Sequence, residues 1–165
     1  MAKKSAGIIL YQHDGEVVKV LLVHPGGPFW AKKDLAAWSI PKGEFDEKED
    51  PREAAKREVA EETGIDLESL RGGESSWIEL APVKQKSGKI IYAWGAQAND
   101  NTLFIKSNFF EMEWPPKSGK YQSFAEVDKA EWFTLDQAKE KIIPGQVPLL
   151  EDLEHRLMKK KSFSL

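Results

Sequence analysis

Residues 43–65 read GEFDEKEDPREAAKREVAEETGI, and this stretch decides the fold. Asp50 is a natural N-cap, Pro51 suits the first helical position, and Glu53 stands where a capping box has its acidic member. Gly64 is placed as a C-terminal breaker. The pattern therefore predicts a helix that begins at Pro51 and ends just before Gly64.

Three glutamates are crowded on this predicted helix. Glu58, Glu61 and Glu62 lie three and four residues apart, so their carboxylates share one face. Like charges at this spacing destabilise a helix by roughly 0.2–0.5 kcal/mol per pair. A hard divalent cation that takes oxygen ligands would explain such crowding. The spacing therefore predicts a metal-binding edge.

The composition fits one soluble domain spanning residues 1–165, long enough to bury a sizeable core. The net charge of -3 gives no case for general nucleic-acid or membrane binding. The absence of cysteine excludes disulfides, zinc–thiolate sites and a cysteine nucleophile. The apolar run at 6–11 is too short for a signal peptide or a membrane span, so we expect a cytoplasmic protein. Segments 1–4 and 159–165 are expected to be flexible ends.

Strands and helices alternate along the rest of the chain. Strand-like segments are 5–12, 16–24, 77–86, 89–98 and 130–133. Further helices are expected at 135–143 and 148–158, and the stretch 99–124 is less regular. This interleaving predicts an α/β domain with a mixed sheet.

The motif extends beyond the three glutamates. Gly43, Glu49 and the run from Arg57 to Ile65 have the spacing of the Nudix box, and the chain resembles Nudix hydrolases over nearly its whole length. The resemblance implies the Nudix fold, a mixed sheet sandwiched between helices that some schemes class as α+β. It also implies hydrolysis of a nucleoside diphosphate linked to another moiety, with magnesium as the cofactor and manganese as a substitute.

The resemblance assigns roles within the box. Glu58 and Glu62 are expected to be the principal metal ligands, with Glu61 as a third and the backbone carbonyl of Gly43 joining them. Arg57 is expected to support the glutamates through charge-assisted hydrogen bonds.

Residues outside the metal edge complete the expected site. Glu49 is expected to form part of the scaffold between loop and helix. Glu126, before the last predicted strand, is the first candidate for a glutamate that completes the site or acts as the base. Glu111 and Glu113 are its rivals, because family members differ in where this residue comes from.

Lys42 bears on the substrate because it directly precedes the box in the run Pro41–Lys42–Gly43. A similar run is familiar from Nudix enzymes that act on dinucleoside polyphosphates, diphosphoinositol polyphosphates and capped RNA. The first expectation is a dinucleoside polyphosphate; ADP-ribose, a nucleotide sugar or a noncanonical nucleoside triphosphate are alternatives. A module that senses a nucleotide without hydrolysing it is an alternative of another class. We expect a small-molecule nucleotide partner and a monomer or homodimer.

Three other residues are candidates for substrate binding. Lys117 and Lys120 form a basic loop that could contact a further phosphate, with a solvent-facing position as the alternative. Trp38 could stack on a nucleobase, with core packing as the alternative. His24 is interpreted as a structural or surface residue, and the segment 25–28 as an ordinary loop.

Overall fold

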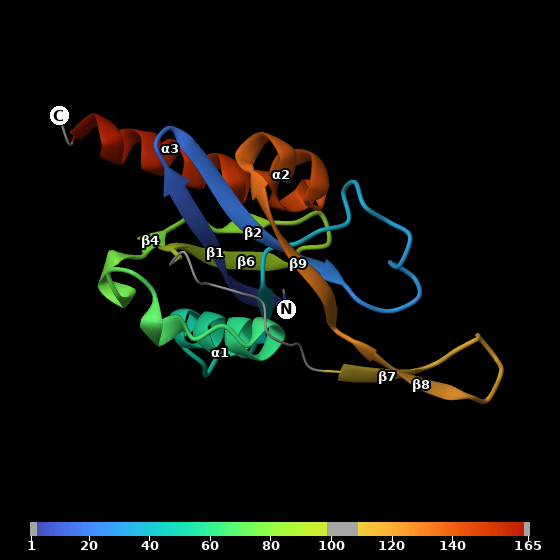
Figure 1. Cartoon of the computed structure of the whole chain (residues 1–165). Coiled ribbons are helices and arrows are strands. Elements are labelled where there is room, and N and C mark those ends of the chain that lie inside the picture. Colours follow the sequence, from blue (N-terminus) through green and yellow to red (C-terminus); the bar gives the residue numbers. More distant parts are fainter. Residues whose placement is uncertain (1–2, 99–108, 164–165) are drawn as a thin grey trace.

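The computed structural model describes residues 3–98 and 109–163 and is built around one mixed sheet (Figure 1). The strands of this sheet are β1 (Lys4–Asp14), β2 (Val17–Pro25), β3 (Lys42–Phe45), β4 (Ile78–Glu79), β5 (Val83–Lys84), β6 (Ile90–Gln97) and β9 (Val127–Thr134). Their order is β4-β6-β1-β2-β9, while β3 pairs with β1 and β5 pairs with β6. The β1–β6 pair is parallel and the other pairs are antiparallel.

Helices cover both faces of the sheet. Helix α1 (Pro51–Thr63) lies on one face, and α2 (Leu135–Lys141) and α3 (Val147–Phe163) lie on the other (Figure 1). Three short 3-10 helices connect the elements, at Leu67–Ser69, Glu74–Ser76 and Pro144–Gln146. The predicted sandwich of a mixed sheet between helices is therefore confirmed. No helix in the described part of the chain is long and apolar enough to cross a membrane.

The central strand β1 shows how the sequence makes two cores. Ile8 and Leu10 point into the core beneath α1, while Ile9 and Tyr11 point into the core beneath α2 and α3. Side chains alternate between the two faces of a strand, so a continuous apolar run suits a strand buried on both faces.

Helix α1 has the bounds that its end signals predict. The Asp50 side chain accepts a hydrogen bond from the Glu53 N–H at 3.1 Å. Gly64 adopts a left-handed conformation, with φ of 71°, and its N–H donates to the carbonyl of Ala60. The buried side of the helix carries Ala54, Ala55, Val59 and Thr63, all fully buried and none of them large, so the helix lies close to the strands.

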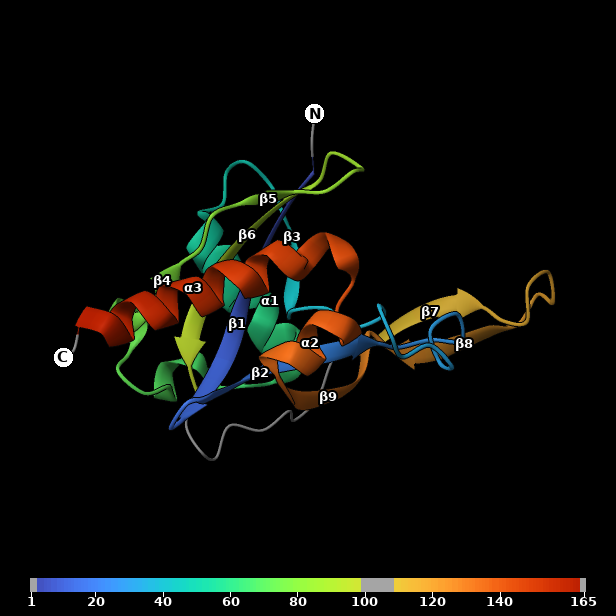
Figure 2. The same ribbon diagram turned by 90° about the horizontal axis from the view of Figure 1, so that it is seen from above.

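One element differs from the sequence-based expectation. Strands β7 (Phe109–Glu113) and β8 (Tyr121–Ala125) form a separate two-stranded sheet that projects from the body of the molecule (Figure 2). Its strands are joined by seven residues instead of a short turn, so this stretch carries no hairpin signature. The first ten residues of the stretch expected to be irregular, 99–108, lie outside the described residues.

Other predicted bounds shift by smaller amounts. The strand expected at 77–86 is divided into β4 and β5, with Pro82 between them. Helix α3 continues to Phe163, beyond the end predicted near residue 158. Lys4 already pairs within the sheet, with Phe45 on one side and Ile90 on the other.

Candidate active site

The last two turns of α1 face strand β3, and this contact brings the predicted metal residues together. A Cβ atom on Gly43 would overlap the carboxylate of Glu58, so any other residue here would displace the Glu58 side chain. The Lys42 N–H donates to Glu62 Oε2 at 3.2 Å. Glu58, Glu62 and the Gly43 backbone thus form one group, as the sequence predicts.

Arg57 holds the acidic loop and the helix together. Its Nε and Nη2 atoms donate to the two carboxylate oxygens of Glu49, each at 2.9 Å. Its Nη1 atom donates to Glu58 Oε1 at 2.7 Å and lies 3.5 Å from Glu61 Oε2. The hydrogen bonds to Glu49 and Glu58 raise the pKa of Arg57. Because one guanidinium orients three carboxylates, its main effect is on geometry, and exposed ion pairs of this kind add little stability.

Glu62 is the most perturbed acid of the group. Burial raises its pKa to about 7, the backbone hydrogen bond from Lys42 opposes the shift, and the charges of Glu126 and Glu58 add to it. Glu126 lies near enough for its charge to raise the pKa of Glu62, although it lies 64 positions beyond Glu62 in the sequence. Of the three candidates, Glu126 is the one that the fold brings to Glu62.

The rival glutamates lie elsewhere. Glu111 and Glu113 are on β7, in the projecting two-stranded sheet. Glu113 accepts a hydrogen bond from the backbone N–H of Lys117 at 2.6 Å, within the connection between β7 and β8. This contact shapes the hairpin tip, so Glu113 has a local structural role.

The donor set fits a hard divalent cation. Carboxylates and a backbone carbonyl are the oxygen ligands that magnesium and manganese prefer. A buried carboxyl whose pKa lies near 7 is also the kind of group that a bound cation would keep ionised. Among residues 3–98 and 109–163, no three His, Asp or Glu side chains form a ready cage, because Glu58 turns to Arg57 and Glu62 to the Lys42 amide.

A pair of lysines adjoins the glutamates. The Lys42 side chain is half-buried; burial and the nearby charge of Lys89 lower its pKa, while Glu62 and Glu44 raise it. Lys89 Nζ lies 3.1 Å from Glu44 Oε1. Sequence reasoning missed Lys89, because only the pairing of β1 with both β3 and β6 brings it near Lys42. The only hint in the sequence was the turn at 87–88, which places Lys89 at the start of the strand expected at 89–98.

The remaining predicted substrate residues lie apart from this group. Trp38 is only 1% exposed and packs edge-on against His24 and Phe133, with ring centroids 5.1 and 5.0 Å away. Its ring has no open face for a nucleobase, so the structure favours the core alternative. Lys117 and Lys120 are exposed at the hairpin tip, which both views show far from α1 (Figures 1 and 2).

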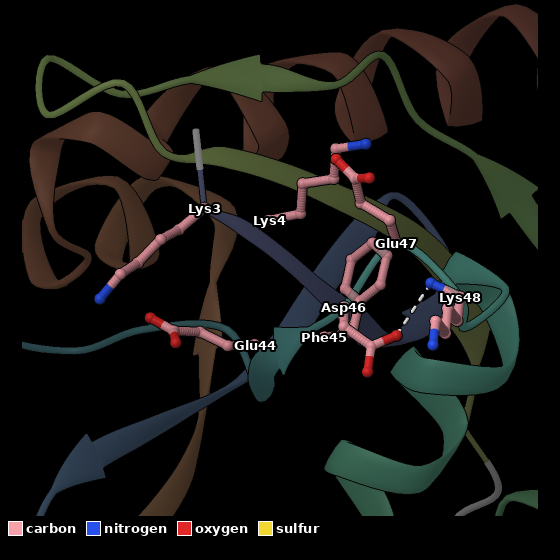
Figure 3. A pocket seen from close by; sticks show the side chains of 7 residues that line it. All are labelled: Lys3, Lys4, Glu44, Phe45, Asp46, Glu47 and Lys48. Carbon is pink, nitrogen blue, oxygen red and sulfur yellow. Dashed lines mark hydrogen bonds between the residues drawn. The ribbon is translucent and has the colours of Figure 1, made fainter. Parts of the chain in front are cut away.

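A pocket of about 460 Å³ adjoins the lysine pair where β1 begins and β3 ends. Its lining residues are Lys3, Lys4, Glu44, Phe45, Asp46, Glu47 and Lys48. Figure 3 shows charged side chains of both signs around the ring of Phe45. Glu44 belongs both to this pocket and to the ion pair with Lys89. The mixed charge distinguishes this pocket from the carboxylate group on α1.

Comparison with known proteins gives concordant results. The family model described as NUDIX domain matches residues 1–153. The RNA pyrophosphohydrolase of Caulobacter vibrioides is 31% identical over 138 residues, which cover 77% of this chain and 76% of that protein. The asymmetrical bis(5'-nucleosyl)-tetraphosphatase of Rattus norvegicus is 30% identical over 112 residues, covering 64% and 72%. The crystal structure of a C. elegans Ap4A hydrolase binary complex has a similar fold, with a TM-score of 0.65 at 23% identity over 96% of this chain and 99% of that one.

Proposed function

This chain belongs to the Nudix family, and from that premise we propose that it is a magnesium-dependent hydrolase of dinucleoside polyphosphates. Its relatives include RNA pyrophosphohydrolases and a bis(5'-nucleosyl)-tetraphosphatase, so the chain is a Nudix pyrophosphohydrolase. The bound metal, the substrate and the roles of individual residues are proposals.

Glu58 and Glu62 hold the metal, with the Gly43 carbonyl and Glu61 as further ligands. Such an ion polarises a phosphoryl oxygen and lowers the pKa of bound water. Arg57 keeps Glu49 and Glu58 in place and so preserves the shape of the loop before the helix. Partial burial of Glu62 strengthens its electrostatic attraction to a cation.

Glu126 is the proposed base. It takes a proton from the attacking water while the water oxygen bonds to phosphorus and the bridging P–O bond breaks, giving two phosphate-bearing products. Its charge already acts on Glu62, which supports a position beside the reacting phosphate.

The lysine pair is the observation that carries the substrate proposal. Lys42 and Lys89 carry charges of the same sign, and they lie close enough for the charge of Lys89 to lower the pKa of Lys42. A chain of several phosphates resolves this repulsion, because its outer phosphates offer negative charge to both ammonium groups. One relative is named as a tetraphosphatase, which agrees with a long phosphate chain.

The metal role is tested with Glu62→Gln, which keeps the acceptor for the Lys42 N–H and removes the charge. We expect normal folding by circular dichroism and a loss of kcat with magnesium of at least about 100-fold. The matched control is Glu140→Gln on α2, across the sheet, which should retain full activity. Wild-type turnover by the Glu62 variant would exclude the metal assignment.

The substrate role is tested with Lys42→Ala and Lys89→Ala on substrates that differ in phosphate number. Each variant should raise KM for bis(5'-adenosyl) tetraphosphate about tenfold, since a hydrogen bond to a charged group contributes about 1.5 kcal/mol. KM for ADP-ribose, with two phosphates, should change less. Equal effects on both substrates would count against the assignment.

RNA with a 5'-triphosphate is the second candidate, favoured by the relatives named RNA pyrophosphohydrolase. It belongs in the same panel, with the products identified by mass spectrometry. A higher kcat/KM for this RNA than for the dinucleoside polyphosphate would replace the first substrate by the second.

A further inference from the structure

Glu126 occupies the single position between β8 and β9, where the chain leaves the two-stranded sheet and enters the large one. Its side chain is exposed, so nothing buries it in a fixed direction. The orientation of the Glu126 carboxylate therefore depends on how rigid the backbone is at this junction.

The residue that follows β2 restrains the Glu126 backbone first. The Gly26 N–H donates to the carbonyl of Glu126 at 2.9 Å. A Cβ atom on Gly26 would overlap the carbonyl oxygen of Ala125, so only glycine permits this approach.

A β-bulge in β9 is the second feature that restrains the backbone at Glu126. In the pairing of β2 with β9, His24 lies opposite Lys129 and Pro25 lies opposite Val127, so Asp128 is the extra residue of β9. Asp128 Oδ1 lies 2.9 Å from His24 Nδ1. Bulges of this kind re-aim side chains next to active sites.

His24 fixes this arrangement from inside the protein. It is 1% exposed, and its Nε2 atom lies 2.7 Å from the carbonyl oxygen of Lys33. The carboxylate of Asp128 and the carbonyl of Lys33 thus each lie at hydrogen-bond distance from one of the two ring nitrogens. One buried ring thus joins β2, β9 and the loop between β2 and β3.

We propose that His24 is a positioning residue for the hydrolysis: it restrains the backbone at Glu126 through Asp128, together with the Gly26 hydrogen bond. The inference rests on the proposed role of Glu126 as the base. It gives a role to Gly26, which lies in a segment expected to be an ordinary loop. It also gives a role to His24, which was expected to be a structural or surface residue.

The test uses two variants that break the same hydrogen bond from opposite ends. Asp128→Ala removes the acceptor, and His24→Gln keeps a donor for the Lys33 carbonyl while losing the donor to Asp128. Each should lower kcat with bis(5'-adenosyl) tetraphosphate and magnesium at least tenfold, since small displacements of a catalytic group have effects of this size. KM and the thermal stabilisation by magnesium should stay within twofold, because the lysines and metal glutamates are untouched. The double variant should lose no more than either single one.

Two controls separate positioning from general damage. Asp128→Asn keeps an oxygen acceptor for His24 and should restore most of kcat. His13→Gln changes an exposed histidine and should behave as wild type. If His24→Gln fails to fold, the comparison of kcat between Asp128→Ala and Asp128→Asn is sufficient to test the positioning role.

The outcomes distinguish this inference from the proposed function. Loss of activity in Glu126→Gln with full kcat in Asp128→Ala would overturn the positioning role and leave the base in place. Full activity in Glu126→Gln would overturn the base and the positioning role together. A uniform rise in KM across the variants would also count against positioning.

Discussion

The carboxyl group of Glu62 lies between α1 and β3, where burial and neighbouring acids raise its pKa to about 7 from an ordinary value of 4.5. A raised pKa means that the folded protein binds this proton more tightly than the unfolded chain does. The stabilisation is fully present below pH 4.5 and is lost as the pH rises through about 7. Metal-free protein is therefore destabilised by its own site at neutral and higher pH.

The first prediction compares wild type with Glu62→Gln in the presence of a chelator. The variant should gain free energy of unfolding relative to wild type, on the order of 2 kcal/mol, between pH 5 and pH 8. Urea titrations at several pH values measure the difference. Parallel stability curves would show that the Glu62 pKa is not raised. Saturating magnesium should remove most of the difference by stabilising wild type.

At the scale of elements, the β7–β8 hairpin depends on a loop far from it in the sequence. A two-stranded sheet alone is at best marginally stable in water. Phe29 lies edge-on to Trp114 with ring centroids 5.6 Å apart, and a Cβ on Gly27 would lie 3.0 Å from the Phe110 ring. The loop following β2 therefore supports one face of the hairpin.

The second prediction is that Phe29→Ala loosens this hairpin and little else. Hydrogen exchange of the β7 and β8 amides should become at least about tenfold faster, since an aromatic pair adds about 0.5–1.5 kcal/mol beyond its buried area. Amides of β1 and β6 should keep their protection. Equal acceleration in both sheets would mean that Phe29 supports the whole fold.

Elements with local signals were predictable from the sequence, and those set by distant partners were not. Helix α1 was predicted to the residue because Asp50, Pro51 and Gly64 carry its ends. The β7–β8 hairpin was missed because its long connection has no turn signature. The same division runs through the site: Glu58 and Glu62 follow from helical spacing, whereas Asp128 meets His24 across 104 positions. Lys89 reaches Lys42 only after three strands have paired.

At the scale of the whole molecule, the described residues form two cores separated by one sheet, and the site lies on the α1 side. Both cores share the central strand β1, which supports the proposal that residues 1–165 are one domain. Leu153 on α3 is fully buried in the opposite core, and its Cδ1 would lie 2.7 Å from a Cβ on Gly95 of β6.

The third prediction separates stability from catalysis at this scale. Leu153→Ala should lower the free energy of unfolding by about 2–5 kcal/mol, because it leaves a cavity between α3 and the sheet. kcat measured well below the melting temperature should remain within twofold of wild type, since the sheet lies between Leu153 and the glutamates. Denaturant titration and steady-state kinetics check the two parts. A large fall in kcat in the still-folded variant would show that the two faces are coupled.

The strand order also has a consequence for the newly made chain. β1 pairs with β6, joining Lys4 to Ile90, and β2 pairs with β9, joining Lys19 to Thr134. The ribosome synthesises β6 and β9 long after the β1–β2 hairpin has emerged. Until then, the edges of this hairpin that pair with β6 and β9 remain unpaired. β3 and α1 are made early, while Glu126 arrives with the last strand. We therefore expect the acidic edge to form during synthesis before a complete active site exists.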